Sequence, residues 1–562
     1  MAPVPVDLSK IDYARLLRRN VSGEGNFMGM RHQRGSMQRG AGLGGILGVA
    51  MGLLPKFLSS SAGQHLISAG KEVTQELAQG NALGKSIKSV AKRKLKEITG
   101  SGPRKRARRT RQIGHGKSIK GDSVTVLKPH LSRDVIVDEL DFSTMPGTQT
   151  CIQNSRWTVV NLKNAFQPEG PWEFVLTNNS RSYLNLKRTY LVYTFDITDP
   201  DGNTIAMPPI TDTSMMYAPI NNIAHSIVRN FTLHINSQLA YHNSSNYAYK
   251  AYFENLLMYG QEIKDSTLTA AGFFFDREIG TRDSEGFRKR CGTGRAQVAA
   301  PVSIDLMNQD RVLLNGCNLK LTAYPNKSEF LIEAYNFGNQ KFKFNVRDVY
   351  ALVNEFDLTD ALSNELEKEV LTHKMVQYPM ISAQVRTFYI DPNRYDSPAN
   401  TLFTSKMPRR IFLGLVSSEA YNGSFGTSPF DFKPYDVTDV HIDYCGQTLP
   451  GRPMDLDFEN NKFIEAYLQL QETLGHTRNN FSCNSIDVGM FRNKGFTIFG
   501  FELSPVAMNN SIFELVRQTN VSVRLNFKKK TPAGGLYCIV YAEFDQLMNL
   551  DPLRNPIFDS IS

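Results

Sequence analysis

From about residue 135 onward, the chain alternates short apolar or β-branched runs with polar turns. Successive side chains of a strand point to opposite faces of a sheet, so this alternation predicts half-buried β-strands. The strands that we predict include residues 157–162, 190–195, 411–416, 521–527 and 537–544. Because few helical patterns separate them, we expect antiparallel sheets packed as jelly rolls or as another kind of sandwich.

One unit of this pattern recurs, loosely, about 210 residues later along the chain. In the first copy, the alternating run 231–236 precedes a polar turn and a short helix that contains Ala251-Tyr252. In the second copy, the run 440–444 precedes a Gly/Pro-rich turn and a helix that contains Ala466-Tyr467. The repeat predicts two similar β-rich modules. We place their boundary at a short polar helix predicted over Leu358–Leu371.

Charge separates the first part of the chain from the rest. Residues 1–120 hold 23 Lys/Arg and 6 Asp/Glu, whereas residues 121–562 hold 41 and 48, so the net charges are +17 and −7. A basic tail on a mildly acidic body indicates that the tail, and not the body, meets polyanions or membrane surfaces. We therefore treat residues 1–135 as an N-terminal extension that is Gly-rich, then helical, then basic.

Two features of the extension suggest binding. Residues 87–98 have the spacing of a basic amphipathic helix, although a solvated helix whose apolar stripe packs on a neighbour is an equal alternative. After Gly100–Pro103, six of eight residues are basic, and such a run repels itself unless an anion neutralises it. We predict DNA binding or nuclear import for Arg104, Lys105, Arg106, Arg108, Arg109 and Arg111.

The one strongly apolar run covers residues 41–54. Its 14 residues include five glycines and are too few to span a bilayer. They can act at a membrane surface, as amphipathic anchors do. The residues that we predict to be membrane-active are Leu43, Ile46, Leu47, Leu53 and Leu54. We expect no signal peptide, because residues 1–20 are polar and charged.

No pattern of residues indicates an enzyme. The six cysteines lie far apart, so we expect reduced and mostly buried thiols. Residues 199–203 begin like a calcium loop but lack the acid at its twelfth position, so a hairpin turn is the better interpretation. Asp455, Asp457 and Glu459 precede a helix and are expected to cap it. We predict no catalytic residue, metal or cofactor.

Several segments, in the same order, resemble one family. They are Glu139–Ser143, Ala251–Glu262, Arg410–Val416, Tyr421–Ser424, Asp457–Asn460 and Tyr541–Asp545. Together they look like the hexon-type major capsid protein of Polinton/Maverick elements and adintoviruses, over residues 139–555. The resemblance implies an all-β double jelly roll, with a first jelly roll over 136–358 and a second over 359–562. It also implies a homotrimer that forms a pseudo-hexagonal capsomer of an icosahedral double-stranded DNA virus or virus-like transposon.

The same resemblance implies partners and a location. The partners are other capsid proteins (penton and minor capsid proteins), packaged double-stranded DNA and an adenovirus-type cysteine protease. The location is the virion capsid, with the host nucleus during assembly. Residues 30–35 and the apolar-then-basic order of the extension resemble the small basic core or membrane-active proteins of these viruses. A fused basic leader departs from the family, whose capsid protein usually begins near the position of Glu139.

A short motif in the extension predicts maturation. Residues 98–102 match the pattern cut by adenovirus-type cysteine proteases, in which Met, Ile or Leu stands two places before a Gly and cleavage precedes a second Gly. The residues are Ile98, Gly100, Ser101 and Gly102, with cleavage after Ser101. The compatible alternative is a helix that ends at Gly100 and a flexible joint behind it.

Two other classes of protein stay open. A host-domesticated nucleic-acid-binding structural protein of transposon origin would explain the basic run, but would leave about 420 residues of β-structure without a role. A secreted lectin or glycan enzyme would explain the strands, but needs a signal peptide and usually a carboxylate pair.

Overall fold

The computed structural model describes residues 148–558, apart from short segments at 178–181, 207–210, 212–213, 243–245, 293, 374, 478–483, 506, 508–511 and 515–516. The predicted N-terminal extension therefore lies outside the described residues. Every strand discussed below pairs antiparallel with its neighbours.

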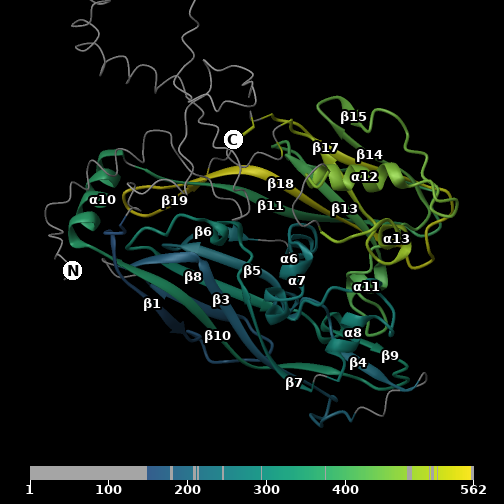
Figure 1. Cartoon of the computed structure of the whole chain (residues 1–562), viewed down its shortest axis with the longest axis horizontal. Coiled ribbons are helices and arrows are strands. Elements are labelled where there is room, and N and C mark those ends of the chain that lie inside the picture. Colours follow the sequence, from purple (N-terminus) through teal and green to yellow (C-terminus); the bar gives the residue numbers. More distant parts are fainter. Residues whose placement is uncertain are drawn as a thin grey trace, which may run out of the picture. The chain divides into compact units, whose positions relative to one another are not determined.

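The first jelly roll consists of two four-stranded sheets (Figure 1). One sheet has the order β1 (Ile152–Val160), β10 (Lys343–Leu358), β3 (Ser182–Thr198), β7 (Arg295–Pro301). The other has the order β2 (Trp172–Thr177), β8 (Asn318–Pro325), β5 (Val228–Ile235), β6 (Gln238–His242). If these eight strands are lettered B to I along the chain, the orders are B-I-D-G and C-H-E-F, which is jelly-roll topology.

The second jelly roll repeats this arrangement. Its B-I-D-G sheet is β11 (Val376–Ile390), β18 (Leu536–Leu550), β13 (Arg410–Ser417), β16 (Ile498–Glu502), with β19 (Pro556–Phe558) beside β18. Its C-H-E-F sheet is β12 (Asp396–Phe403), β17 (Val521–Phe527), β14 (Val437–Tyr444), β15 (Gln447–Leu449). The predicted all-β double jelly roll is confirmed.

The predicted repeat corresponds to equivalent parts of the two jelly rolls. In each, strand E is followed by strand F and then by a helix, which is α6 (Tyr247–Leu257) in the first and α12 (Ile464–Thr473) in the second. Helix α10 (Asp360–His373) follows β10 directly and falls where the polar helix was predicted. The described strands pair only within their own jelly roll or in the small sheet of β4 (Met216–Pro219) and β9 (Ile332–Tyr335). We keep 136–358 and 359–562 as the proposed domains.

Alternating burial shows how the sequence builds these sheets. Along β17, every second residue is buried, from Val521 to Phe527, so one face of the strand lies in the core. In the first jelly roll, Trp172 of β2 packs on Tyr193 of β3 across the two sheets, with ring centroids 5.9 Å apart. In the second, Phe403 of β12 meets Phe544 of β18 at 5.2 Å. Each jelly roll thus has its core between its two sheets.

Shorter elements fill the connections. They are α5 (Ile223–Ser226), α7 (Gln261–Lys264), η3 (Thr267–Ala271), α8 (Glu285–Arg290), η4 (Asp305–Asn308), α9 (Ser328–Leu331), α11 (Ser418–Asn422) and α13 (Val488–Asn493). No helix of the described part is long and apolar enough to cross a membrane.

Candidate functional site at the junction of the two jelly rolls

Helix α6 lies between the two jelly rolls (Figure 1). Ten of its eleven residues are buried, and only Glu254 is partly exposed. A helix that is apolar on nearly every side must be covered on every side. Here β5 covers it from the first jelly roll, while β11 and β18 cover it from the second. The helix therefore belongs to the first jelly roll by sequence and joins the second by packing.

Aromatic side chains make the apolar part of this contact. Tyr252 of α6 stacks on Phe430, with centroids 4.0 Å apart and planes 1° from parallel. Phe253 lies 5.2 Å from Phe432 and 5.8 Å from Tyr541 of β18. Such pairs each contribute about 0.5–1.5 kcal/mol beyond the burial of their area.

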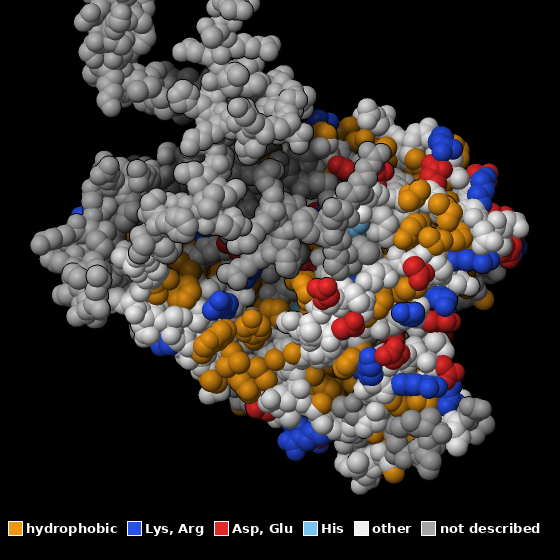
Figure 2. Space-filling model, viewed as in Figure 1, with side chains coloured by type: hydrophobic (Ala, Val, Ile, Leu, Met, Phe, Trp, Pro, Cys, Tyr) orange, Lys and Arg blue, Asp and Glu red, His pale blue; other side chains and the backbone are white. Residues whose placement is uncertain are grey.

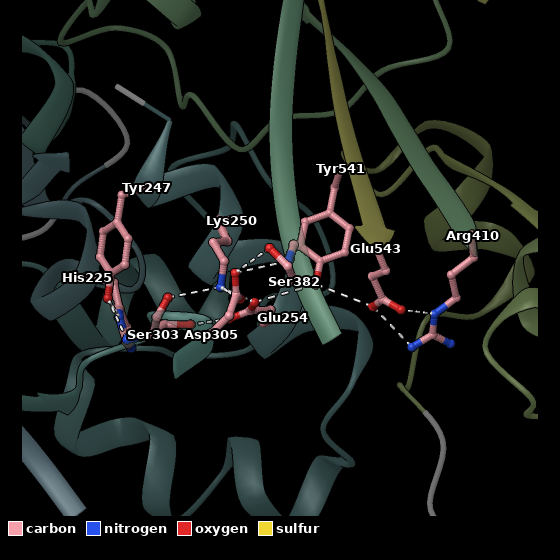
Figure 3. Close-up of polar contacts among 11 residues, drawn as sticks. His225, Tyr247, Lys250, Glu254, Ser303, Asp305, Ser382, Arg410, Tyr541 and Glu543 are labelled. Carbon is pink, nitrogen blue, oxygen red and sulfur yellow. Dashed lines mark hydrogen bonds and ion pairs between the residues drawn. The ribbon is translucent and has the colours of Figure 1, made fainter. Parts of the chain in front are cut away.

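A buried cation, Lys250, lies on the same helix (Figure 3). Its Nζ is 2.5 Å from Glu254 Oε1 and 3.0 Å from Asp305 Oδ1 of η4, and it donates to the Ser303 carbonyl at 2.9 Å. Burial alone would lower the pKa of Lys250, but Asp305 and Glu254 outweigh it and raise that pKa well above the ordinary value. The ammonium thus stays charged, and all three of its protons have acceptors.

Asp305 extends this cluster into the second jelly roll. Its Oδ2 accepts from the Ser382 hydroxyl at 3.2 Å and from the Ala383 backbone N–H at 3.1 Å, both on β11. One carboxylate therefore holds the lysine of the first jelly roll with one oxygen and a strand of the second with the other.

The network continues through Glu254 to β18 and β13 (Figure 3). The Tyr541 hydroxyl lies 3.5 Å from Glu254 Oε1 and 3.4 Å from Glu543 Oε1. Arg410 of β13 donates to both oxygens of Glu543, at 2.5 Å from Nε and 3.1 Å from Nη2. Burial is the main cause that raises the pKa of Glu254 above its ordinary value, while Lys250 opposes the rise.

At the other end of the network, His225 is held neutral. The Tyr247 hydroxyl accepts from the Ser303 backbone N–H at 3.0 Å and lies 3.0 Å from His225 Nδ1. The direction of the hydrogen bond between the hydroxyl and Nδ1 depends on the tautomer of the imidazole. Burial, with a further effect of Lys250, lowers the pKa of His225 to about 3.

A second lysine makes a similar link. Lys264 of α7 is fully buried and donates to the carbonyls of Leu256 at 2.7 Å and Asn484 at 2.5 Å. Asn484 belongs to the second jelly roll. The ammonium also lies 4.7 Å from the centroid of the Phe275 ring.

These groups form a structural site. Lys250, Asp305 and Glu543 are buried, and Arg410 is partly buried. Lys250 pairs with Asp305 and Arg410 with Glu543, so each charge is directed at a protein partner. Breaking such a pair is costly, and a satisfied buried network favours one packing arrangement over others. Its chemical role is to hold the two jelly rolls in one relative orientation. Within the described residues, no group of three or more His, Cys, Asp or Glu side chains is placed to hold a metal ion.

None of the site residues predicted from the sequence falls within the described part of the chain. The basic run, the cleavage motif and the membrane-active residues all precede residue 148 and lie outside the described residues. Sequence reasoning missed Lys250, Asp305 and Glu543. One signal was available for the first, because Lys250 and Glu254 form an i,i+4 pair within an otherwise apolar helix.

One sequence interpretation was wrong. Asp455, Asp457 and Glu459 do not cap α12, whose N-cap is Phe463 without a side-chain hydrogen bond. Instead they make ion pairs with lysines, at 2.7 Å between Asp457 and Lys528. Lys528 and Lys529 directly follow β17, and both pair with Glu459.

The cysteines and the predicted hairpin turn can be compared directly. All five described cysteines are free thiols, but only Cys317 and Cys538 are buried, so the expected burial holds for those two. Residues 199–203 form a turn in which Asp199 N–H donates to the Asn203 carbonyl at 3.0 Å. A bridge between Thr198 and Thr204 extends it as a hairpin.

The topology identifies the class of fold. Two tandem eight-stranded jelly rolls of this topology make a double jelly roll, a fold shared with a chain of a virophage particle. A chain of the Sputnik virophage particle matches with a TM-score of 0.55 and 11% identity, over 79% of this chain and 94% of its own. The mavirus major capsid protein matches with a TM-score of 0.46 and 12% identity, over 79% and 97%.

Sequence comparison gives a close relative. No protein-family model matches the chain. The uncharacterized protein F54H12.2 of Caenorhabditis elegans is 81% identical over 418 residues, which are 74% of this chain and all of the nematode protein. The chain therefore belongs to the family of this nematode protein.

Proposed function

We propose that the chain is the major capsid protein of an icosahedral double-stranded DNA virus or virus-like transposon, and that three copies form a pseudo-hexagonal capsomer. The observation that carries the proposal is the junction itself, where α6 and the buried network hold two equivalent jelly rolls in one orientation. Three such chains in a closed ring present six similar wedges, which is a unit that can tile a shell.

The source of this capsid protein is a Polinton/Maverick element or an adintovirus. The proposal rests on the six segments between Glu139 and Asp545 that resemble that family. The 81% identical relative is a protein of an animal, which supports an element carried in animal genomes. The capsomers would assemble with penton and minor capsid proteins, in the host nucleus, into virions.

In this proposal, the N-terminal extension serves DNA packaging and particle maturation. Its six basic residues between Arg104 and Arg111 bind packaged DNA through phosphates, and the same run can serve nuclear import. An adenovirus-type protease cuts after Ser101 and releases residues 1–101, whose net charge is +9 and whose apolar segment then contacts a membrane surface.

Multi-angle light scattering of the purified full-length chain at micromolar concentration tests the capsomer. A trimer has a mass of about 190 kDa, three times the 63.2 kDa of one chain. A chain that stays monomeric at micromolar concentration and binds DNA would refute the capsomer and favour a domesticated nucleic-acid-binding protein. Sedimentation velocity at several concentrations distinguishes a closed trimer from open-ended association, because only the closed ring stops at three.

A further inference from the structure

Helices α6 and α12 occupy equivalent places, and their sequences align without a gap. Each follows strand F of its jelly roll, and Ala251-Tyr252 corresponds to Ala466-Tyr467. In that register, Tyr249 corresponds to Ile464 and Phe253 to Leu468. Both pairs occupy positions i and i+4, so each lies on one face of its helix.

The equivalent residues have opposite environments. Tyr249 and Phe253 are buried, because they pack on the second jelly roll through Tyr421, Phe432 and Tyr541. Ile464 and Leu468 are 44% and 51% exposed. Figure 2 shows apolar side chains on the surface in the region where Figure 1 places α12 and α13. At the two positions where the first jelly roll packs on the second, the second jelly roll thus has apolar side chains that are exposed.

Helix α6 packs on the B-I-D-G sheet of the second jelly roll, on the face that points away from the core of that jelly roll. Tyr541 of β18 faces α6, whereas Phe544, three residues on, points to the core and meets Phe403. Across the sheet, Tyr541 is paired with Val385 of β11 and Phe412 of β13. This apolar row therefore lies on the face that receives α6, away from the core between the two sheets.

The first jelly roll has an apolar row on the equivalent strands. Leu352 of β10 is paired with Val159 of β1 and Tyr190 of β3. Tyr190 lies on the outer face, because Tyr193, three residues on, points to the core and meets Trp172. Beside this row, the Trp157 ring lies 5.9 Å from the Tyr190 ring. Trp157 and Val159 are each about half exposed, at 51% and 56%.

We propose that α12 of one copy docks through Ile464 and Leu468 on the outer face of β1-β10-β3 of a second copy. This contact between chains would repeat the contact that α6 makes within one chain with the outer face of β11-β18-β13. The inference rests on the proposed capsomer. Each copy carries both the helix and the receiving face, so the contact is head-to-tail, and a rotation of about 120° between copies would close it into a ring of three chains. With three copies, all six jelly rolls then make equivalent contacts.

The contact between chains differs from the one within a chain in its charges. Glu465 and Gln469 of α12 stand where Lys250 and Glu254 stand in α6, and Glu465 is exposed and paired with Arg452. The buried ion network therefore has no equivalent in the contact between chains. Association then depends mainly on apolar burial, so it is reversible and depends on concentration.

Substitutions on both sides of the contact test it in the full-length chain. Leu468→Asp on the helix and Val159→Asp on the receiving face should each weaken trimer formation at least about 30-fold, the effect of losing one interface hot spot. Leu371→Asp is the matched control, because Leu371 is an exposed helical leucine of α10 and belongs to neither proposed contact surface. It should leave the trimer intact, and circular dichroism should show the same fold in all variants.

A cross-link gives an independent readout. Ile464→Cys and Val159→Cys, combined with Cys445→Ser to remove an exposed thiol, should yield disulfide-linked chains up to trimers on mild oxidation, while either cysteine alone should not. A wild-type trimer that neither aspartate variant weakens and that the cysteine pair does not link would overturn this inference and leave the capsomer standing. A wild-type chain that is monomeric at every concentration would overturn both.

Discussion

The junction predicts a large effect from a single buried cation. Lys250→Met keeps the length of the side chain and removes its ammonium, which leaves Asp305 and Glu254 close together in the interior. Breaking a buried ion pair from one side costs about 3–5 kcal/mol of unfolding free energy. For a body of about 400 residues, unfolding entropy near 2 cal/mol/K per residue converts this into a melting-temperature decrease of about 4–6 °C.

Thermal melts by circular dichroism and by intrinsic fluorescence measure this loss. The control is Lys187→Met, because Lys187 pairs with Asp310 at 2.5 Å at the surface, where a pair contributes about 0–1 kcal/mol. Adding Glu254→Gln and Asp305→Asn to Lys250→Met should recover part of the loss, since no unpaired charge then remains. If Lys250→Met melts within about 1 °C of Lys187→Met, the network does not hold the junction.

Three further predictions concern titration, nucleic acid and maturation. The pKa of His225 is about 3 in the folded chain, so between pH 6.5 and 3 only the unfolded chain binds a proton at this residue. The contribution of the neutral, buried His225 to the free energy of unfolding should therefore be complete above pH 6.5 and fall by up to about 1.4 kcal/mol per pH unit below it. Urea unfolding at pH 6.5 and 5 should show this decrease in the wild type and a smaller one in His225→Asn, and equal decreases would contradict the burial argument. DNA affinity of the full chain should fall with salt at a log–log slope of about −5, and a slope near zero, or unchanged affinity after all six basic residues of 104–111 become Ala, would exclude phosphate binding by that run. Mass spectrometry of purified particles should find a chain that begins at Gly102, which Gly100→Ala should abolish, whereas particles with only the uncut chain would exclude this maturation step.

Strand pattern and repeat allowed most of the fold to be predicted from the sequence. Residues 521–527 form β17 with the predicted bounds, because alternate burial on one sheet face leaves a period of two in the sequence. The two predicted strand-turn-helix units correspond to strand E, strand F and the following helix of each jelly roll. They could be recognised because two similar domains in tandem have apolar residues at equivalent positions.

The junction was harder to predict, because its partners are distant in sequence. Lys250 meets Asp305, and Asp305 meets Ser382 of the other jelly roll, so no local pattern links the three residues. The carboxylates near α12 show the reverse problem. Their position before the helix suggested a helix cap. In the fold, however, Asp457 pairs with Lys528 and Glu459 with Lys529, and these lysines are about 70 residues away in the sequence.

Electron microscopy of the purified full-length protein tests the capsid proposal most directly. Class averages should show one particle with a three-fold ring and a six-lobed, pseudo-hexagonal outline, in which each copy contributes two adjacent lobes. Capsomers that tile into sheets or closed shells at higher concentration would extend the result. A field of single two-lobed particles, with no rings at micromolar concentration, would contradict the assignment of this chain as a major capsid protein.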